Sequence, residues 1–304
     1  MEWLVMSTER IGFIGLGVMG LPMARNLITA GFSLTVNDRV AERAAAVGKE
    51  GARLAGSARE VTENSDIVIS MVPSSPDVEA VYFGRGGIAE AARPDLLAID
   101  MSTIAPGVAK KVAEKAAALG IRTLDAPVTG GEIGAVQATL TIMIGGDADD
   151  VVRAMPLFQA MGKSVVHIGP HGAGQTCKLA NQIAVAVNNL AASEALVFAA
   201  SQGIDLEKCR EVLASGSGSS HAFRTFAPKM LARDFKPGFT IDLQQKDLRL
   251  VLDTAFDAHV SLPGTALTHQ LYSALQQAGG GKQAHIALIK AIERLSGVEA
   301  RTSS

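Results

Sequence analysis

The sequence has few of the features that mark secreted, metal-binding or nucleic-acid-binding proteins. Its 304 residues include two cysteines, whose spacing matches neither a disulfide framework nor a zinc site. The six histidines form no close metal-ligand spacing, so no metal is expected. A formal net charge of −2 gives no electrostatic reason to expect binding to nucleic acid or to an anionic membrane. The first ten residues lack the basic region and apolar core of a signal peptide, which favours a cytoplasmic protein.

Aromatic residues are also scarce, at 4% of the chain, although 48% of the chain is hydrophobic. This composition is typical of helical and α/β proteins with a large aliphatic core. The most apolar stretch, residues 179–200, is interrupted by polar residues that include Asn181, Asn188 and Glu194. These interruptions favour a buried helix over a membrane span.

Apolar strand-like and helix-like segments alternate up to about residue 168, and helical patterns alone follow. Alternation of this kind predicts a doubly wound, mostly parallel sheet of the Rossmann type, and the later part predicts an all-α domain. We therefore expect an N-terminal extension at 1–9, a dinucleotide-binding domain at 10–170, and a helical substrate and oligomerisation domain at 171–304. The expected strands are Ile11–Ile14, Ser33–Val36, Ile67–Met71, Leu97–Asp100, Arg122–Ala126, Leu140–Ile144 and Val165–Ile168. The expected helices of the second part are Gln175–Gln202, Leu206–Ala214, Ser220–Arg233, Ile241–Ala258, Pro263–Ala278 and His285–Leu295.

A glycine motif follows the first expected strand. Its three glycines are Gly15, Gly17 and Gly20, with Val18 and Met19 between the last two. In a G-x-G-x-x-G turn the first glycine allows the tight turn, the second lets a pyrophosphate approach the backbone, and the third lets helix and strand pack closely. Because a strand precedes the motif and a helical pattern follows it, we interpret it as a dinucleotide site.

The residues after the second expected strand bear on which dinucleotide is used. Asp38 lies eighteen residues after Gly20, where a carboxylate accepts hydrogen bonds from the adenosine ribose and repels a 2′-phosphate. Its neighbour Arg39 could hold that phosphate instead. We therefore expect NAD, with NADP as the alternative.

Further candidate residues follow other strands, where ligands of open α/β sheets bind. Met71, Val72 and Pro73 follow one buried strand, and Thr103 follows the next, with a hydroxyl that could reach the nicotinamide ribose. The segment Thr129–Gly131 offers backbone N–H groups that could hold a carboxylate, although a flexible loop is an equally good interpretation.

Two lysines are candidates for chemistry. Lys178 and Asn181 are three residues apart near the start of a long helical run, so they share one helix face and could together bind a carbonyl oxygen and a carboxylate. Because the run begins at the expected domain junction, an active site is favoured there. Lys246 shares a partly apolar helix face with Leu243 and Leu250, and a surface lysine is the alternative for it.

Taken together, these motifs resemble the β-hydroxyacid dehydrogenase family. Four segments carry the resemblance: residues 15–20, residues 125–131, residues 172–181, and residues 235–239 leading to Lys246 and Asp247. It covers nearly the whole of residues 10–295. Residues 130–135 and the three glycines at 279–281 are most similar to the tartronate semialdehyde reductases (2-hydroxy-3-oxopropionate reductases) within the family, with the 3-hydroxyisobutyrate dehydrogenases as the alternative.

The resemblance implies an NAD(P)-dependent oxidoreductase that interconverts a small β-hydroxyacid and its semialdehyde. It implies that Lys178 is catalytic and that Asn181 orients the substrate. A non-catalytic dinucleotide-binding module is the alternative of another class. The apolar helix after Lys178 leads us to expect a homodimer or homotetramer. The implied substrate contacts are Thr129, Gly130, Gly131 and Lys246, and the implied cofactor contacts include Val72, Pro73, Thr103 and Lys246.

Overall fold

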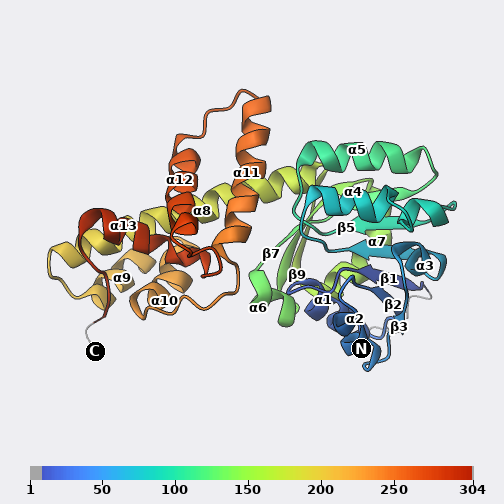
Figure 1. Cartoon of the computed structure of the whole chain (residues 1–304), viewed down its shortest axis with the longest axis horizontal. Coiled ribbons are helices and arrows are strands. Elements are labelled where there is room, and N and C mark those ends of the chain that lie inside the picture. The colour runs from blue at the N-terminus through green and yellow to red at the C-terminus, as the bar shows by residue number, and fades with distance from the viewer. Residues whose placement is uncertain (1–8, 303–304) are drawn as a thin grey trace. The chain divides into compact units, whose positions relative to one another are not determined.

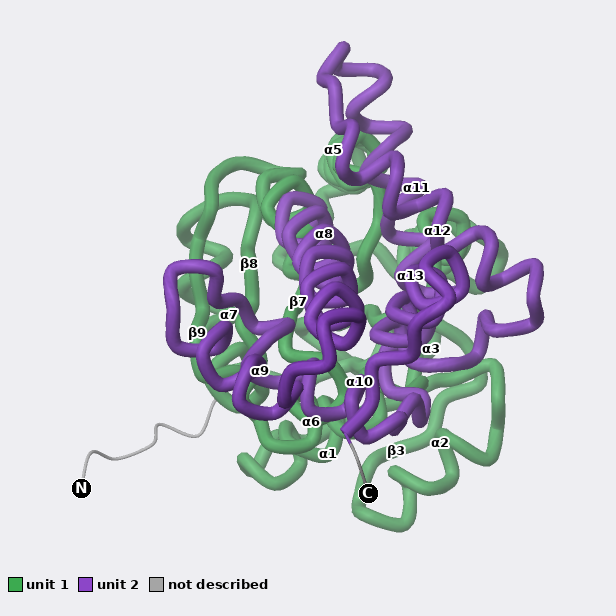
Figure 2. The backbone as a smooth tube through the Cα atoms, turned by 90° about the vertical axis from the view of Figure 1, so that its left-hand side faces the viewer, with its two compact units in different colours: residues 1–178 green, residues 179–304 purple. Residues whose placement is uncertain are grey.

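A computed structural model describes residues 9–302 of the chain. Its contacts divide the chain into two compact units, residues 1–178 and 179–304 (Figure 2). Helix α8 (Ala173–Ser201) runs through the division between the two units. Apart from Glu9, the expected N-terminal extension lies outside the described residues.

The first unit is built on a mostly parallel sheet, as the alternating pattern predicts (Figure 1). In spatial order its strands are β3 (Arg53–Leu54), β2 (Leu34–Asn37), β1 (Ile11–Ile14), β4 (Ile67–Ser70), β5 (Leu97–Asp100), β6 (Arg122–Asp125), β8 (Leu140–Gly146) and β7 (Val128–Thr129), and β9 (Gly162–Gly169) also pairs with β8. The β6–β8 and β7–β8 pairs are antiparallel, and the other pairs are parallel. The sequence pattern misses β3 and β7 because strands of two residues are too short to show a period.

Alternate residues of the central strands enter two separate cores. Ile11 and Phe13 belong to one core, which also contains residues of α1 (Gly20–Thr29), α2 (Ala41–Gly48) and α7 (Ala148–Met161). Ile14 belongs to the other, with residues of α3 (Ala58–Glu63), α4 (Ser75–Phe83) and α5 (Pro106–Ala117). Because each fully buried aliphatic side chain contributes about 1.5–3 kcal/mol, both faces hold the sheet firmly and its strand ends are well placed.

The second unit is helical, as expected. Its helices after α8 are α9 (Leu206–Ser215), α10 (Ala227–Leu231), α11 (Ile241–Asp257), α12 (Pro263–Gln277) and α13 (Ile289–Ser296). The helix expected at Ser220–Arg233 is present, but it is not α-helical throughout. A π-helical turn at Ala222–Phe226 precedes α10, because Pro228 lacks the N–H that an uninterrupted helix would use. The helix expected at His285–Leu295 likewise begins with a 3₁₀ turn at His285–Leu288.

Helix α8 is long and apolar enough, by length and composition, to cross a membrane. Its residues Ala186, Leu190 and Leu196 nevertheless belong to the buried core of the second unit. Gln182 and Asn189 are buried on the same helix, and buried polar side chains need partners that a lipid tail does not provide. The features of α8 are therefore those of a core helix.

Candidate active site

The glycine loop between β1 and α1 has the geometry of a dinucleotide site. Gly15 has a φ of +94°, and a Cβ there would lie 2.3 Å from the Met71 carbonyl oxygen. A Cβ on Gly20 would lie 1.9 Å from the Gly15 carbonyl oxygen, whereas a Cβ on Gly17 would meet nothing within 4 Å. Helix α1 has no acidic residue in its first turn, and Met19 gives it no side-chain cap. Its N-terminus can therefore receive an anion, so the loop fits the diphosphate of NAD or NADP.

Asp38 lies directly after β2 and holds the glycine loop. Its Oδ2 accepts a hydrogen bond from the Leu16 N–H at 2.6 Å, and its Oδ1 accepts one from the Val40 N–H at 2.7 Å. The side chain is 5% exposed. A carboxylate has about four acceptor positions, so ribose hydroxyls can bind beside these two N–H groups. The sequence predicts that Asp38 contacts the ribose but does not reveal that it also holds the loop.

Two arginines lie close to Asp38 in the sequence. Arg39 is largely exposed and lies 3.5 Å from a carboxylate oxygen of Asp77, and Arg43 lies 4.0 Å from Asp38. Sequence reasoning leaves Asp77 and Arg43 out of the cofactor site. Both arginines could approach a 2′-phosphate, while Asp38 would repel it. Val18, next to Gly17 in the loop, is exposed.

The last residues of β4, β5 and β6 form a polar row, because Ser70, Asp100 and Asp125 are register partners. The Ser70 hydroxyl donates to Asp100 Oδ1 at 2.8 Å, and the Ser102 hydroxyl donates to the same oxygen at 2.7 Å. The Ser102 hydroxyl in turn accepts from the Val72 N–H at 2.9 Å. Burial raises the pKa of Asp100 to about 6. Asp100 therefore joins the two loops that carry the predicted cofactor contacts Met71, Val72, Pro73 and Thr103.

The start of α8 is fixed to the same strand ends. Asp125 accepts hydrogen bonds from the Gly172 N–H at 2.7 Å and from the Gln175 N–H at 2.9 Å. Burial raises the pKa of this carboxyl. The Gln175 side chain donates to the Ser102 carbonyl at 2.7 Å and accepts from the Ile104 N–H at 3.1 Å. Lys178, the sixth residue of α8, is 7% exposed.

In the second unit, hydrogen bonds connect the predicted substrate residues Asn181 and Lys246. The Asn181 amide donates to Gln182 Oε1 at 3.0 Å, and the Gln182 amide donates to Asp247 Oδ2 at 2.6 Å. The Lys246 Nζ lies 3.0 Å from Asp247 Oδ1. Gln182 and Asp247 are both buried, and sequence reasoning gives neither of them a role. The one signal for them is the presence of polar side chains within apolar helical stretches.

The predicted carboxylate loop is a strand-to-helix turn. Thr129 ends β7, and Gly131 begins the short helix α6 (Gly131–Val136). Gly130 and Gly131 have φ angles of 128° and 63°, which strain any other residue. A Cβ on Gly131 would meet nothing within 4 Å, so the space beside this residue is open. Carboxylate binding here stays a prediction.

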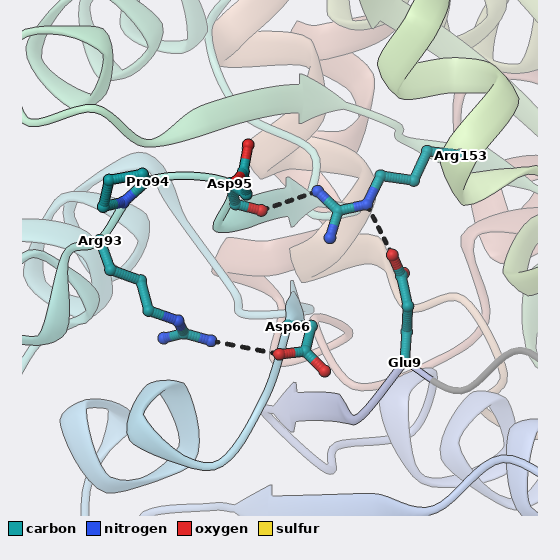
Figure 3. A pocket seen from close by; sticks show the side chains of 6 residues that line it. All are labelled: Glu9, Asp66, Arg93, Pro94, Asp95 and Arg153. Carbon is teal, nitrogen blue, oxygen red and sulfur yellow. Dashed lines mark hydrogen bonds and ion pairs between the residues drawn. The ribbon is translucent and has the colours of Figure 1, made fainter.

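Two further features concern the described residues. Within residues 9–302, no cluster of three or more histidine, cysteine, aspartate or glutamate side chains could hold a metal ion. A cavity of about 190 Å³ is lined by Glu9, Asp66, Arg93, Pro94, Asp95 and Arg153 (Figure 3). These lining residues precede β1, β4 and β5 or lie on α7, so the cavity is at the amino ends of the strands, away from the glycine loop.

Comparison with known proteins identifies the family. Residues 10–169 match the family model described as the NAD binding domain of 6-phosphogluconate dehydrogenase. Residues 172–292 match the model described as NAD-binding of NADP-dependent 3-hydroxyisobutyrate dehydrogenase. The chain is 44% identical over 289 residues to the 2-hydroxy-3-oxopropionate reductase of Escherichia coli, which covers 94% of this chain and 98% of the relative. The chain belongs to the β-hydroxyacid dehydrogenase family.

Other members of the β-hydroxyacid dehydrogenase family act on different substrates. The NAD-dependent L-serine dehydrogenase of Pseudomonas aeruginosa is 38% identical over 89% of this chain and 93% of its own length. A solved structure of Mycobacterium tuberculosis 3-hydroxyisobutyrate dehydrogenase with L-serine has a TM-score of 0.88 and 34% identity, covering 93% of this chain and 99% of the other. The protein is thus an NAD(P)-dependent β-hydroxyacid dehydrogenase, which confirms the predicted enzyme class over the binding-module alternative.

Proposed function

We propose that this β-hydroxyacid dehydrogenase reduces tartronate semialdehyde (2-hydroxy-3-oxopropionate), with 3-hydroxyisobutyrate oxidation as the second candidate. The observation that carries the proposal is the 44% identity, over almost the full length of both chains, to the 2-hydroxy-3-oxopropionate reductase of Escherichia coli. The choice between these substrates rests on that similarity and on the glycine-rich segments at 130–135 and 279–281, which resemble the same enzymes.

Lys178 is the proposed acid–base residue. The nicotinamide ring of the bound cofactor supplies the hydride in reduction and accepts it in oxidation. In reduction, the Lys178 ammonium donates a proton to the aldehyde oxygen as the carbonyl carbon gains the hydride, and in oxidation the neutral amine takes the proton from the hydroxyl. Lys178 is 7% exposed, so its ammonium group is largely shielded from bulk water.

The substrate carboxylate is proposed to bind the turn at Thr129–Gly131, with Asn181 and Lys246 as further substrate contacts. Two features support this assignment. The positive φ angles at Gly130 and Gly131 turn the backbone sharply at this point, and successive peptide N–H groups in such a turn suit an anion. The Asn181 and Lys246 side chains are both linked to the buried pair Gln182 and Asp247, which limits their motion.

NAD(H) is proposed as the preferred cofactor, with NADP(H) as the alternative. Two backbone N–H groups hold the buried Asp38 carboxylate in place. It would lie close to a 2′-phosphate and repel it, because both groups are negatively charged. Arg39 and Arg43 carry positive charges that would attract a 2′-phosphate. Each of them already lies beside a carboxylate, Arg39 beside Asp77 and Arg43 beside Asp38. The ratio of kcat/KM for NADH and NADPH on one semialdehyde measures the preference, and a clear NADPH advantage would overturn it.

The proposed function is tested with two measurements on the purified enzyme. Lys178→Ala should lower kcat by at least about 10²-fold while NADH binding changes little, because general acid–base catalysis contributes about 10²–10⁴-fold. Near wild-type kcat in this variant would contradict the role of Lys178. A semialdehyde should also be strongly preferred over the matching aldehyde without a carboxylate, because donors built for an anion are left unpaired without it. Equal kcat/KM for the two compounds would reject the carboxylate site.

We further propose a cytoplasmic homo-oligomer, a dimer or a tetramer. Both cysteines are free, as is usual in a reducing compartment. Phe198 of α8 and Phe256 of α11 are large apolar side chains with exposed fractions of 69% and 81%, and contact with another subunit would bury them. Light scattering during size-exclusion chromatography measures the assembly, and a monomer at micromolar concentration would contradict the proposal.

A further inference from the structure

The backbone around Asp125 is shaped to bring its carboxylate against the start of α8. A Cβ on Gly145 would lie 2.5 Å from Asp125 Oδ1, and a Cβ on Gly174 would lie 2.9 Å from Asp125 Oδ2. Gly172 has a φ of +84°, which turns its N–H toward the same carboxylate. The absence of a side chain at Gly145 and Gly174 leaves room for the Asp125 carboxylate, and Gly172 donates a hydrogen bond to it. A side chain at Gly145 or Gly174 would displace the carboxylate. The packing explains why Gly172 and Gly174 both precede the lysine.

The two hydrogen bonds to Asp125 secure the first turn of α8. The first N–H groups of a helix have no partner within the helix, so a buried helix start needs an acceptor from elsewhere. Asp125 supplies both of its oxygens, one to Gly172 and one to Gln175. A negative charge at this end of a helix is also favoured by the helix dipole. Lys178 lies one turn beyond Gln175 on the same helix.

Gln175 connects that turn to the cofactor loop after β5. Its side-chain amide bridges the Ser102 carbonyl and the Ile104 N–H, the two peptide groups on either side of Thr103. Gln175 is fully buried, so these bonds are not replaced by water. The predicted cofactor contact Thr103 and the predicted catalytic Lys178 are therefore joined through one side chain, and both belong to the first unit.

We propose that Asp125 and Gln175 are positioning residues that lock the first turn of α8 to the ends of β5 and β6, so that Lys178 keeps a fixed place relative to the cofactor loop at Ser102–Thr103. The inference rests on the proposed role of Lys178. It gives a positioning role to two buried side chains that transfer neither the hydride nor the proton. A displacement of about 1 Å at a reacting group can cost about 10²-fold in rate, so loss of either residue should act through Lys178.

The test uses Asp125→Asn and Gln175→Met in the full-length enzyme. Asp125→Asn keeps the volume but replaces one acceptor oxygen with an NH₂ that faces an N–H donor. Gln175→Met keeps the length and removes both bonds to the cofactor loop. Each variant should lower kcat by about 10- to 10²-fold. NADH affinity, measured by fluorescence titration, should change less than kcat, because the glycine loop and Asp38 are untouched. In the protein without cofactor, the amide hydrogens of residues 172–178 should exchange faster than in the wild type.

A double-mutant cycle distinguishes positioning from a general loss of structure. If Asp125 and Gln175 act through Lys178, adding either change to Lys178→Ala should lower kcat no further. Asp150→Asn is the matched control, because Asp150 is a buried carboxylate of the same unit that pairs with Arg122 at 2.8 Å instead. It should lower thermal stability and leave kcat per folded molecule unchanged.

The outcomes separate this inference from the proposed function. Wild-type kcat in Lys178→Ala would reject the proposed function. An inactive Lys178→Ala together with wild-type kcat in Gln175→Met and Asp125→Asn would reject the positioning alone. The positioning would also be rejected if either change lowered kcat in the Lys178→Ala background by the same factor as in the wild type. If Asp125→Asn does not fold, Gln175→Met still tests the positioning. This substitution removes only the two bonds between the Gln175 side chain and the loop after β5, and the hydrogen bonds from the start of α8 to Asp125 remain.

Discussion

The two ends of the sheet in the first unit hold their carboxylates by different means. At the amino ends, beside the cavity of Figure 3, Asp66 pairs with Arg10 at 2.7 Å and with Arg93 at 3.6 Å. At the carboxyl ends, Asp100 and Asp125 accept hydrogen bonds from neutral hydroxyl and N–H groups. The first set is in contact with solvent, and the second set is buried.

The pKa values follow this difference. The hydrogen bond from Arg10 lowers the pKa of Asp66 to about 2, whereas burial raises the pKa of Asp100 to about 6. Ionised Asp66 thus stabilises the fold at neutral pH, and ionised Asp100 destabilises it. A buried carboxylate at a strand end is therefore poorly explained by stability. Asp100 and Asp125 instead fix the loops after β4 and β5 and the start of α8, and a catalytic site needs such fixed positions.

The largest effect should come from the glycines that let the carboxyl ends approach α1. Gly20→Ala should cost about 3 kcal/mol of unfolding free energy or more, because its Cβ would lie 1.9 Å from a backbone oxygen. Gly17→Ala is the matched control, since its Cβ meets nothing within 4 Å of the protein. It should keep the stability and weaken NADH binding by crowding the diphosphate. Equal unfolding free energies, by urea titration, would show that the loop does not pack as described.

Asp100→Asn should change how stability depends on pH. A carboxyl whose pKa is raised on folding binds its proton more tightly in the folded state, so stability falls as pH rises from about 3.8 to about 6. Between pH 5 and pH 8 the wild type should lose about 1.4 kcal/mol that Asp100→Asn does not lose. Unfolding free energies at the two pH values measure this difference. A variant with the same pH dependence as the wild type would contradict the raised pKa.

The smallest effect should come from the amino ends. Asp66→Asn should cost about 1 kcal/mol of stability at pH 7, because partly exposed ion pairs contribute little. A carboxyl whose pKa is lowered on folding contributes stability above about pH 3.8 and loses it as pH falls toward about 2, so the cost should vanish in acid. The kcat should not change. A fall in kcat as large as that of Asp125→Asn would remove the functional contrast between the two ends.

The sequence predicts the glycine loop, Asp38 and the strand ends because each has a local signature. G-x-G-x-x-G and an acidic residue after a strand depend on a few neighbours along the chain. Gln175 and Gln182 have no such signature, since their partners Ser102 and Asp247 are 73 and 65 residues away. Similarly, the register that aligns Ser70, Asp100 and Asp125 becomes visible only after the strands pair.

Helix boundaries show the same limit. The π-helical turn at Ala222–Phe226, just before α10, agrees with Pro228, which the sequence displays, but apolar periodicity alone does not distinguish a π-helical turn from an α-helix. The two-residue strand β7 matters for the candidate site because it ends at Thr129, yet it exists only through its pairing with β8. Long-range pairing therefore decides the details that local patterns leave open.

The bond between Asp38 and the Leu16 N–H has a consequence for cofactor engineering. Exchange of Asp38 for a small neutral residue would remove the charge that repels a 2′-phosphate, but it would also release the glycine loop from the end of β2. The loop would then have to be ordered by the incoming nucleotide, and the entropy lost would weaken both cofactors. Asparagine removes the negative charge and keeps one acceptor, but with its oxygen on the Leu16 N–H its NH₂ faces the Val40 N–H. Cofactor choice and loop order are therefore coupled at this position.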